Sequence, residues 1–178
     1  MPLPGIARVR ANFRAALHAL LGAPRLYRAA RRAGAGVIDA LGLLGTSALV
    51  LFVIAPRAAG VAGRQNAARH FVWQALLTAR YGEPVAQAVG RAQEAGSVQP
   101  RDSAVDLHNN AAGQAYGAAH AVELAGVSVF DAAGAALRAA LAAWDAGELA
   151  TTRAPGAGPA GHRRRRGSTG RATPREPT

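Results

Sequence analysis

The sequence contains no cysteine and no lysine, and only 5% of its residues are aromatic. Without cysteine it has neither disulfides nor thiolate metal ligands. Half of the residues are apolar, and many of these are alanine. Because alanine is the best helix former and is rare in strands, this composition predicts an all-α protein. A length of 178 residues suits one domain with appendages.

Acidic residues are almost absent from the two ends of the chain. Residues 1–36 hold seven arginines and no acid, and residues 151–178 hold seven arginines and one glutamate. Residues 37–150 hold seven arginines and nine acids, so the net charge of +11 is the sum of +7, −2 and +6. A protein that binds specific nucleic acids would carry arginines interleaved with aromatic residues on its folded domain. This chain carries its excess of arginines at its ends, so we expect no specific nucleic-acid partner. The basic ends favour anionic surfaces, lipid headgroups included.

Composition divides the chain into four parts. Residues 1–36 form a basic N-terminal region, in which apolar residues at helical spacing over 5–22 predict an amphipathic helix. Residues 37–56 form a hydrophobic helix, and residues 63–148 form a helical domain. Residues 149–178 have almost no apolar side chains to bury, and they are expected to be a disordered, arginine-rich tail.

The hydrophobic helix leaves two interpretations open. From Ala40 to Ala55 the chain has 16 residues without a charge, which span about 24 Å of a hydrocarbon core about 30 Å thick. The segment is either inserted in a membrane or buried in the protein core. If residues 37–55 span the membrane, the arginines before them predict that the N-terminus is cytoplasmic. If these residues are buried in the core instead, we expect a cytoplasmic protein. With the amphipathic helix, we expect an anionic membrane surface as partner, and protein partners stay open.

The helical domain is predicted to contain four helices. Capping residues, prolines and glycines delimit them at residues 66–81, 84–95, 104–125 and 132–147. Short connections make successive helices antiparallel neighbours, so the first and third run parallel. The first turns of these two helices and the last turn of the second therefore meet at one end of a small helical bundle.

Polar side chains gather at that shared end. The first helix carries Asn66, Arg69, His70 and Trp73 on one face, the third carries Asp106, Asn109, Asn110 and Gly113, and the second ends with Gln93 and Glu94. Two glycines in register, Gly113 and Gly117, indicate a close crossing with a neighbouring helix. The sequence thus predicts a polar pocket.

One interpretation of the pocket is catalytic. His70 held by Asp106 would act as a general base on water, with Glu94 beside them. Arg69 and the amides of Asn109 and Asn110 would stabilise an oxyanion or hold a phosphate. Asn66, Trp73 and Gly113 complete the set, as binding or orienting residues. The corresponding function is a small hydrolase acting on a lipid or another phosphorylated substrate.

Two further interpretations use the same residues. His70, Glu94 and Asp106 would supply three ligands to a divalent metal ion and leave a position for water, although their spacing is not an established metal signature. Alternatively, the cluster is a non-catalytic hydrogen-bonded network that only fixes the register of the helices. In that case the protein is a structural or interaction module.

The motifs resemble those of a bacterial domain family of unknown function. Its members share an Arg-His-x-x-Trp helix, a His-Glu pair and the pattern Asp-x-x-Asn-Asn-x-x-Gly. The resemblance covers about residues 63–125, with Arg69, His70 and Trp73 in the first element and Asp106 to Gly113 in the last. Gln93 stands where the family usually has the histidine of the His-Glu pair. The resemblance implies no activity.

Overall fold

All regular structure in the described residues is helical, which confirms the predicted all-α class. The computed structural model describes residues 22–95 and 100–151. A helix at residues 22–32 is followed by α2 (Val37–Leu49), a π-helical turn η1 (Val50–Ile54), a 3-10 turn η2 (Ala55–Ala58), α3 (Arg64–Tyr81), α4 (Glu83–Glu94), α5 (Pro100–Ala119), α6 (Ala121–Ala125) and α7 (Val129–Asp145). The predicted helix over 5–22 and the predicted tail lie almost wholly outside these residues.

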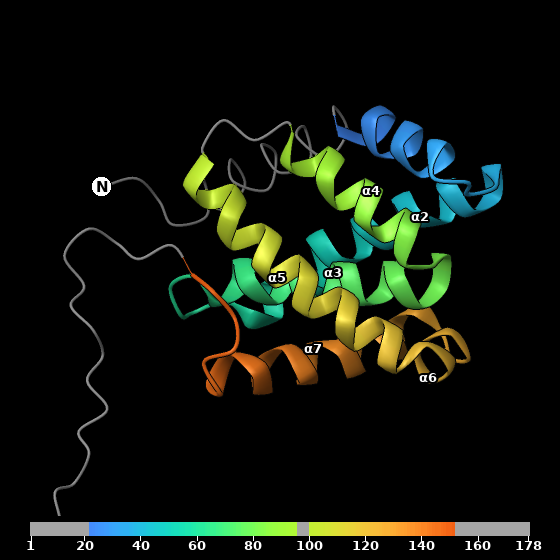
Figure 1. Ribbon diagram of the computed structural model, residues 1–178. Helices are drawn as coiled ribbons and strands as arrows, with labels where there is room; N and C mark the ends of the chain where they lie inside the picture. Colours follow the sequence, from blue (N-terminus) through green and yellow to red (C-terminus); the bar gives the residue numbers. More distant parts are fainter. Residues whose placement is uncertain (1–21, 96–99, 152–178) are drawn as a thin grey trace, which may run out of the picture.

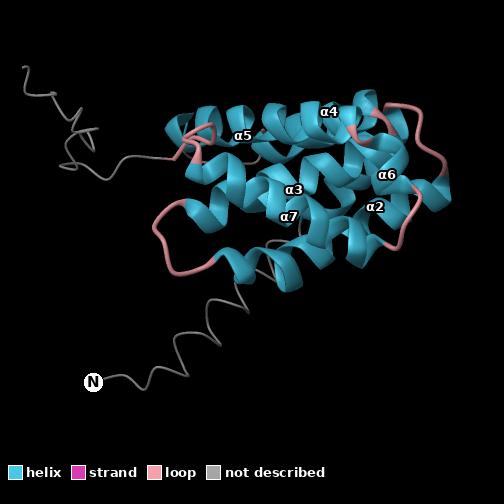
Figure 2. Ribbon diagram, turned by 90° about the horizontal axis from the view of Figure 1, so that it is seen from below, coloured by secondary structure: helices cyan, strands magenta, loops and turns pink. Residues whose placement is uncertain are grey.

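Helix α3 is the centre of the fold. It contacts α2, α4, α5, α6 and α7 as well as the two turns η1 and η2, and it lies between α5 and α7 in both views (Figures 1 and 2). All residues from Ala67 to Thr78 except Arg69 are buried. Two of them, His70 and Gln74, are polar side chains with less than a twentieth of their surface exposed. Such side chains require hydrogen-bond partners inside the protein.

Helix α5 supplies those partners because it runs parallel to α3. Three hydrogen-bonded side-chain pairs that join the two helices are Asn66 with Asp106, His70 with Asn110, and Gln74 with Gln114. In each pair the residues are 40 positions apart, and successive pairs are about one helical turn apart. This constant offset confirms the predicted parallel arrangement.

The two glycines of α5 lie against the backbone of α3. A β-carbon at Gly113 would lie 2.3 Å from the carbonyl oxygen of Phe71, and one at Gly117 would lie 2.3 Å from that of Ala75. These distances are far below ordinary van der Waals contact, so any side chain at either position would force the helices apart. The close crossing predicted from the glycine spacing is confirmed.

The third predicted helix is interrupted, and its prediction as one helix to residue 125 was wrong. Helix α5 ends at Ala119, and His120 has φ −114° and ψ 25°, outside the helical range. The imidazole of His120 packs on Tyr116, with ring centroids 4.3 Å apart, and lies 3.0 Å from the carboxylate of Glu123. The segment predicted as a loop before Ser103 instead begins α5 at Pro100, a residue suited to a first helical turn.

Replacing Gly113 with alanine is expected to destabilise the protein by about 1–3 kcal/mol, because the added methyl group overpacks the contact between α3 and α5. Gly45 of α2 is the matched control, since a β-carbon there meets nothing within 4 Å. Gly45→Ala should stabilise the protein by about 0.5–1 kcal/mol through helix propensity. Urea unfolding measures both changes. Equal effects of the two substitutions would contradict the close packing.

Candidate functional site

The imidazole of His70 lies at the centre of a polar cluster. Its Nδ1 atom is 2.9 Å from Oδ1 of Asn110. Its Nε2 atom is 2.9 Å from Nη2 of Arg69 and 3.2 Å from Oδ2 of Asp106. Residues from α3 and α5 that are predicted to share a pocket therefore do meet, around a histidine that is only 3% exposed.

Asn66 links the side chains of Arg69 and Asp106. Its Nδ2 donates to Oδ1 of Asp106 over 2.6 Å, and its Oδ1 accepts a hydrogen bond from Arg69. Each oxygen of the Asp106 carboxylate thus has its own neighbour: Oδ1 has the amide of Asn66, and Oδ2 has the imidazole. The carboxylate is fixed in orientation as well as in position.

Glu94 joins the cluster from the end of α4. One potential ligand atom each of Glu94, His70 and Asp106 lies within 4.8 Å of the other two. Ser103, near the start of α5, forms a hydrogen bond with the Glu94 carboxylate. We call Asn66, Arg69, His70, Glu94, Asp106 and Asn110 the His70 cluster.

Burial and neighbouring charges shift the pKa values of both carboxyl groups. Burial, together with the negative charge of Asp106, raises the pKa of Glu94 above its usual range, although His70, Ser103 and Arg69 act against this. Burial also acts to raise the pKa of Asp106, but its interactions with His70, the hydrogen bond from Asn66 and the positive charge of Arg69 outweigh it. The pKa of Asp106 is therefore lowered. The two carboxyl groups differ in proton affinity, as an acid–base pair requires.

Arg69 is held in surroundings that disfavour its charge. Burial lowers the pKa of its guanidinium, and the charges of Asp106 and Glu94 compensate only in part. A guanidinium remains protonated in proteins even so. The cluster therefore combines one positive side chain and two acidic ones around a histidine.

The remaining predicted residues have different positions. The Trp73 ring meets the His70 ring edge-on, with centroids 6.3 Å apart, and its Nε1 donates to Oγ of Ser47 on α2. Gly113 contributes close backbone contact and no polar group. Gln93, next to Glu94, accepts a hydrogen bond of 3.5 Å from Arg25.

Asn109 is not brought into the cluster. Its Nδ2 donates to the carbonyl oxygen of Ala150 and its Oδ1 accepts from the amide of the same residue. Next to it, His108 contacts the carbonyl oxygen of Glu148. These two side chains attach the segment that follows α7 to the outer side of α5, so the second amide proposed for an oxyanion site has a structural partner instead.

Sequence reasoning missed two members of the arrangement. Ser103 precedes the third predicted helix, and its hydrogen bond with Glu94 depends on how α4 approaches α5. The Gln74–Gln114 pair continues the series of contacts along α3 and α5 at the same offset of 40 residues. That offset, measured between Asn66 and Asp106, would have been sufficient to find the pair.

The comparison with protein families agrees with the resemblance. Residues 54–132 match the family model of a domain of unknown function, DUF6973. This DUF6973 segment runs from η2 through α3, α4, α5 and α6 to the start of α7, and it contains the whole His70 cluster. No curated protein and no solved structure matches the chain.

Proposed function

We propose that the His70 cluster is the active site of a small hydrolase that cleaves phosphoester bonds. The observation that carries this proposal is the convergence of an imidazole, two carboxyl groups of different proton affinity and a guanidinium at one end of α3, α4 and α5. Perturbed titratable groups of opposite charge concentrate at catalytic sites more often than elsewhere.

A purely structural role does not account for the charged members. The Gln74–Gln114 pair shows that neutral amides suffice to join α3 to α5 in this register. Arg69 and Glu94 lie outside the series of pairs, and both are only partly buried. Placing partly desolvated charges beside the neutral pairs costs free energy that register alone would not require.

The proposed reaction assigns roles to Glu94 and Arg69. A water molecule bound within the His70 cluster attacks phosphorus, and the bond from phosphorus to the leaving oxygen breaks. The proton of the water passes to Glu94, whose raised pKa suits a proton acceptor, and then to the leaving oxygen. Arg69 has five donor hydrogens, more than its two contacts use, and it binds the phosphoryl oxygens.

Rates with p-nitrophenyl phosphate and bis(p-nitrophenyl) phosphate test the proposal on the full-length chain. Glu94→Gln should lower kcat by roughly 10²–10⁴-fold, because it removes the proton acceptor and keeps the side-chain shape. The matched control is Glu83→Gln, an exposed glutamate at the opposite end of the same helix. The proposal fails if both variants hydrolyse the two substrates at the wild-type rate, or if the wild type hydrolyses neither.

The structural alternative gives a different result for Asp106. If the cluster only fixes helix register, Asp106→Asn should lower the free energy of unfolding by about 2–4 kcal/mol, as expected for a broken buried pair. If the cluster is an active site, Asp106→Asn should instead remain folded and lose its hydrolytic activity. Thermal melting and the rate assay, carried out on the same preparation, separate the two.

A second function, association with an anionic membrane surface, is favoured by the helix from Val37 to Ala58. This helix is long and apolar enough to cross a membrane, and 28% of its most apolar window is buried. Leu43, Val50 and Ile54 pack into the core, whereas Ile38, Leu41 and Phe52 are 84%, 56% and 43% exposed. A helix that is buried on one face and apolar on the other suits a position at the lipid surface.

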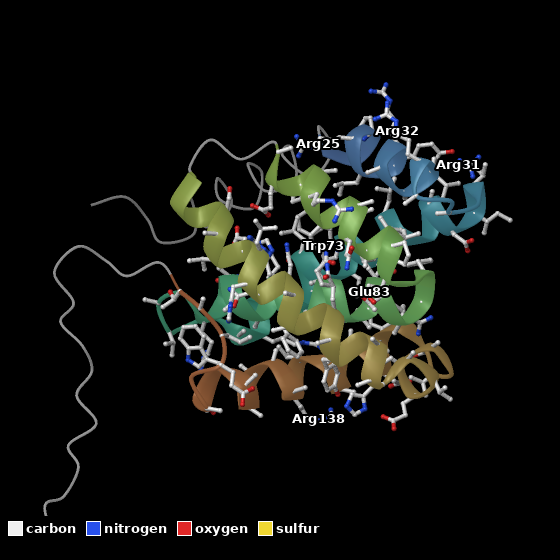
Figure 3. The ribbon with its side chains drawn as sticks, viewed as in Figure 1. Arg25, Arg31, Arg32, Trp73, Glu83 and Arg138 are labelled. Atoms are coloured by element: carbon white, nitrogen blue, oxygen red, sulfur yellow. The ribbon has the colours of Figure 1, made fainter. Side chains whose placement is uncertain are left out.

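Charge near that helix supports the same function. The preceding helix, residues 22–32, has four exposed arginines and no acidic residue. Figure 3 shows Arg25, Arg31 and Arg32 along the edge of the molecule, with Arg32 directed away from its body, and Arg31 donates to the carbonyl oxygen of Ala35. Each arginine close to an anionic bilayer contributes about 1 kcal/mol of attraction. We therefore propose that residues 22–58 dock on anionic lipid.

Sedimentation with phosphatidylcholine vesicles, with and without phosphatidylglycerol, measures this docking. Ile38→Asp should weaken binding to the anionic vesicles about tenfold or more, because an exposed isoleucine no longer inserts. Val122→Asp is the matched control, since Val122 is 88% exposed on α6. Equal losses for the two variants, or no sedimentation of the wild type, would argue against docking through this face.

A further inference from the structure

We infer that His70, Glu94 and Asp106 bind one divalent transition-metal ion, with Zn²⁺ or Mn²⁺ as the expected species. This inference rests on the proposed hydrolase function: the ion would hold and activate the water, and Glu94 would bind the ion with one carboxylate oxygen and accept the proton with the other. Binding of the ion can be measured without any activity. Four arguments from the His70 cluster support this inference: the spacing of the ligand atoms, the hydrogen bonds behind them, the conflict around Nε2 of His70, and the net charge of the cluster.

The ligand atoms are spaced as a metal site requires. Ligands about 2.0–2.1 Å from a tetrahedral zinc ion are about 3.3 Å from one another. Nε2 of His70 and Oδ2 of Asp106 are 3.2 Å apart. The Glu94 ligand atom lies within 4.8 Å of both, at the end of a side chain that is only partly buried and can turn to close the remaining distance.

Hydrogen bonds behind two of the ligands fix their orientation. Oδ1 of Asn110 accepts from Nδ1 of His70, so Nδ1 carries a proton and Nε2 is the ring nitrogen that faces Asp106 and Glu94. Nδ2 of Asn66 holds Oδ1 of Asp106 and leaves Oδ2 turned toward the imidazole. Metal-ligating histidines and carboxylates are almost always oriented in this way by a second group.

The two neighbours of Nε2 make opposite demands on it. Arg69, at 2.9 Å, can only donate, and so it requires a lone pair on Nε2. The Asp106 carboxylate, at 3.2 Å, only accepts, and so it requires a proton or a cation between itself and the same nitrogen. A metal ion bound to both Nε2 and Oδ2 satisfies the imidazole and the carboxylate together.

Charge favours the exchange of Arg69 for an ion at this position. With a neutral imidazole, Glu94, Asp106 and Arg69 give the cluster a net charge of −1. Arg69 has a second partner, Oδ1 of Asn66, to which it can still donate when an ion takes its place at Nε2 of His70. An imidazole with two carboxylates is a ligand set for Zn²⁺ or Mn²⁺ rather than for Mg²⁺ or Ca²⁺, which prefer oxygen alone.

Calorimetric titration of the chelator-treated, full-length protein with Zn²⁺ and Mn²⁺ tests the inference. The wild type should bind one ion per chain saturably, and its Tm should rise with the ion concentration. Glu94→Gln and Asp106→Asn should each weaken binding at least about tenfold, as expected for a lost ligand. Arg69→Gln should tighten it, because a competing positive charge is removed.

His120→Ala is the matched control, because His120 forms a second pair of histidine and carboxylate with Glu123, outside the cluster. This variant should bind as the wild type does. Absence of saturable binding, equal weakening by His120→Ala and Glu94→Gln, or an unchanged affinity in Arg69→Gln would overturn the inference. A chain that binds the ion but cleaves no phosphoester would overturn the proposed function alone, whereas hydrolysis that persists after chelation would overturn the metal site alone.

Discussion

The close parallel contact between α3 and α5 is the constraint on which the rest of the structure depends. Gly113 and Gly117 let the backbones approach, because a β-carbon at either position would collide with α3. The approach fixes an offset of 40 residues for three polar pairs between the two helices, and it also brings His70 to Asp106, one turn earlier on α5 than its partner Asn110. The His70 cluster is the part of this contact that lies where α4 ends.

The same contact combines a structural and a chemical role. Gln74 and Gln114 show that neutral amides hold the two helices in register. One turn earlier, Asn110 also orients the imidazole of His70, and two turns earlier Asn66 orients the Asp106 carboxylate. Neutral amides therefore hold the charged groups in place, which is the arrangement expected around a functional site.

Much of this arrangement could be predicted from the sequence, because it depends on helix periodicity and short connections. The parallel run of α3 and α5, the close crossing at Gly113, and the meeting of His70 with Asp106 follow from spacing alone. The role of Asn109 could not be predicted, because its partner Ala150 returns to α5 only after α7. The end of α5 at His120 was not predicted, although the side chains that His120 contacts, Tyr116 and Glu123, are only four and three residues away.

The central claim is that Asn110 holds Nδ1 of His70 and leaves the lone pair of Nε2 facing the two carboxylates. Long-range ¹H–¹⁵N correlation of the imidazole at neutral pH, without added metal, measures this most directly. A protonated Nδ1 and an unprotonated Nε2 are the predicted result. Protonation of both nitrogens, as in a closed ion pair with Asp106, would contradict the account and leave the His70 cluster a structural network.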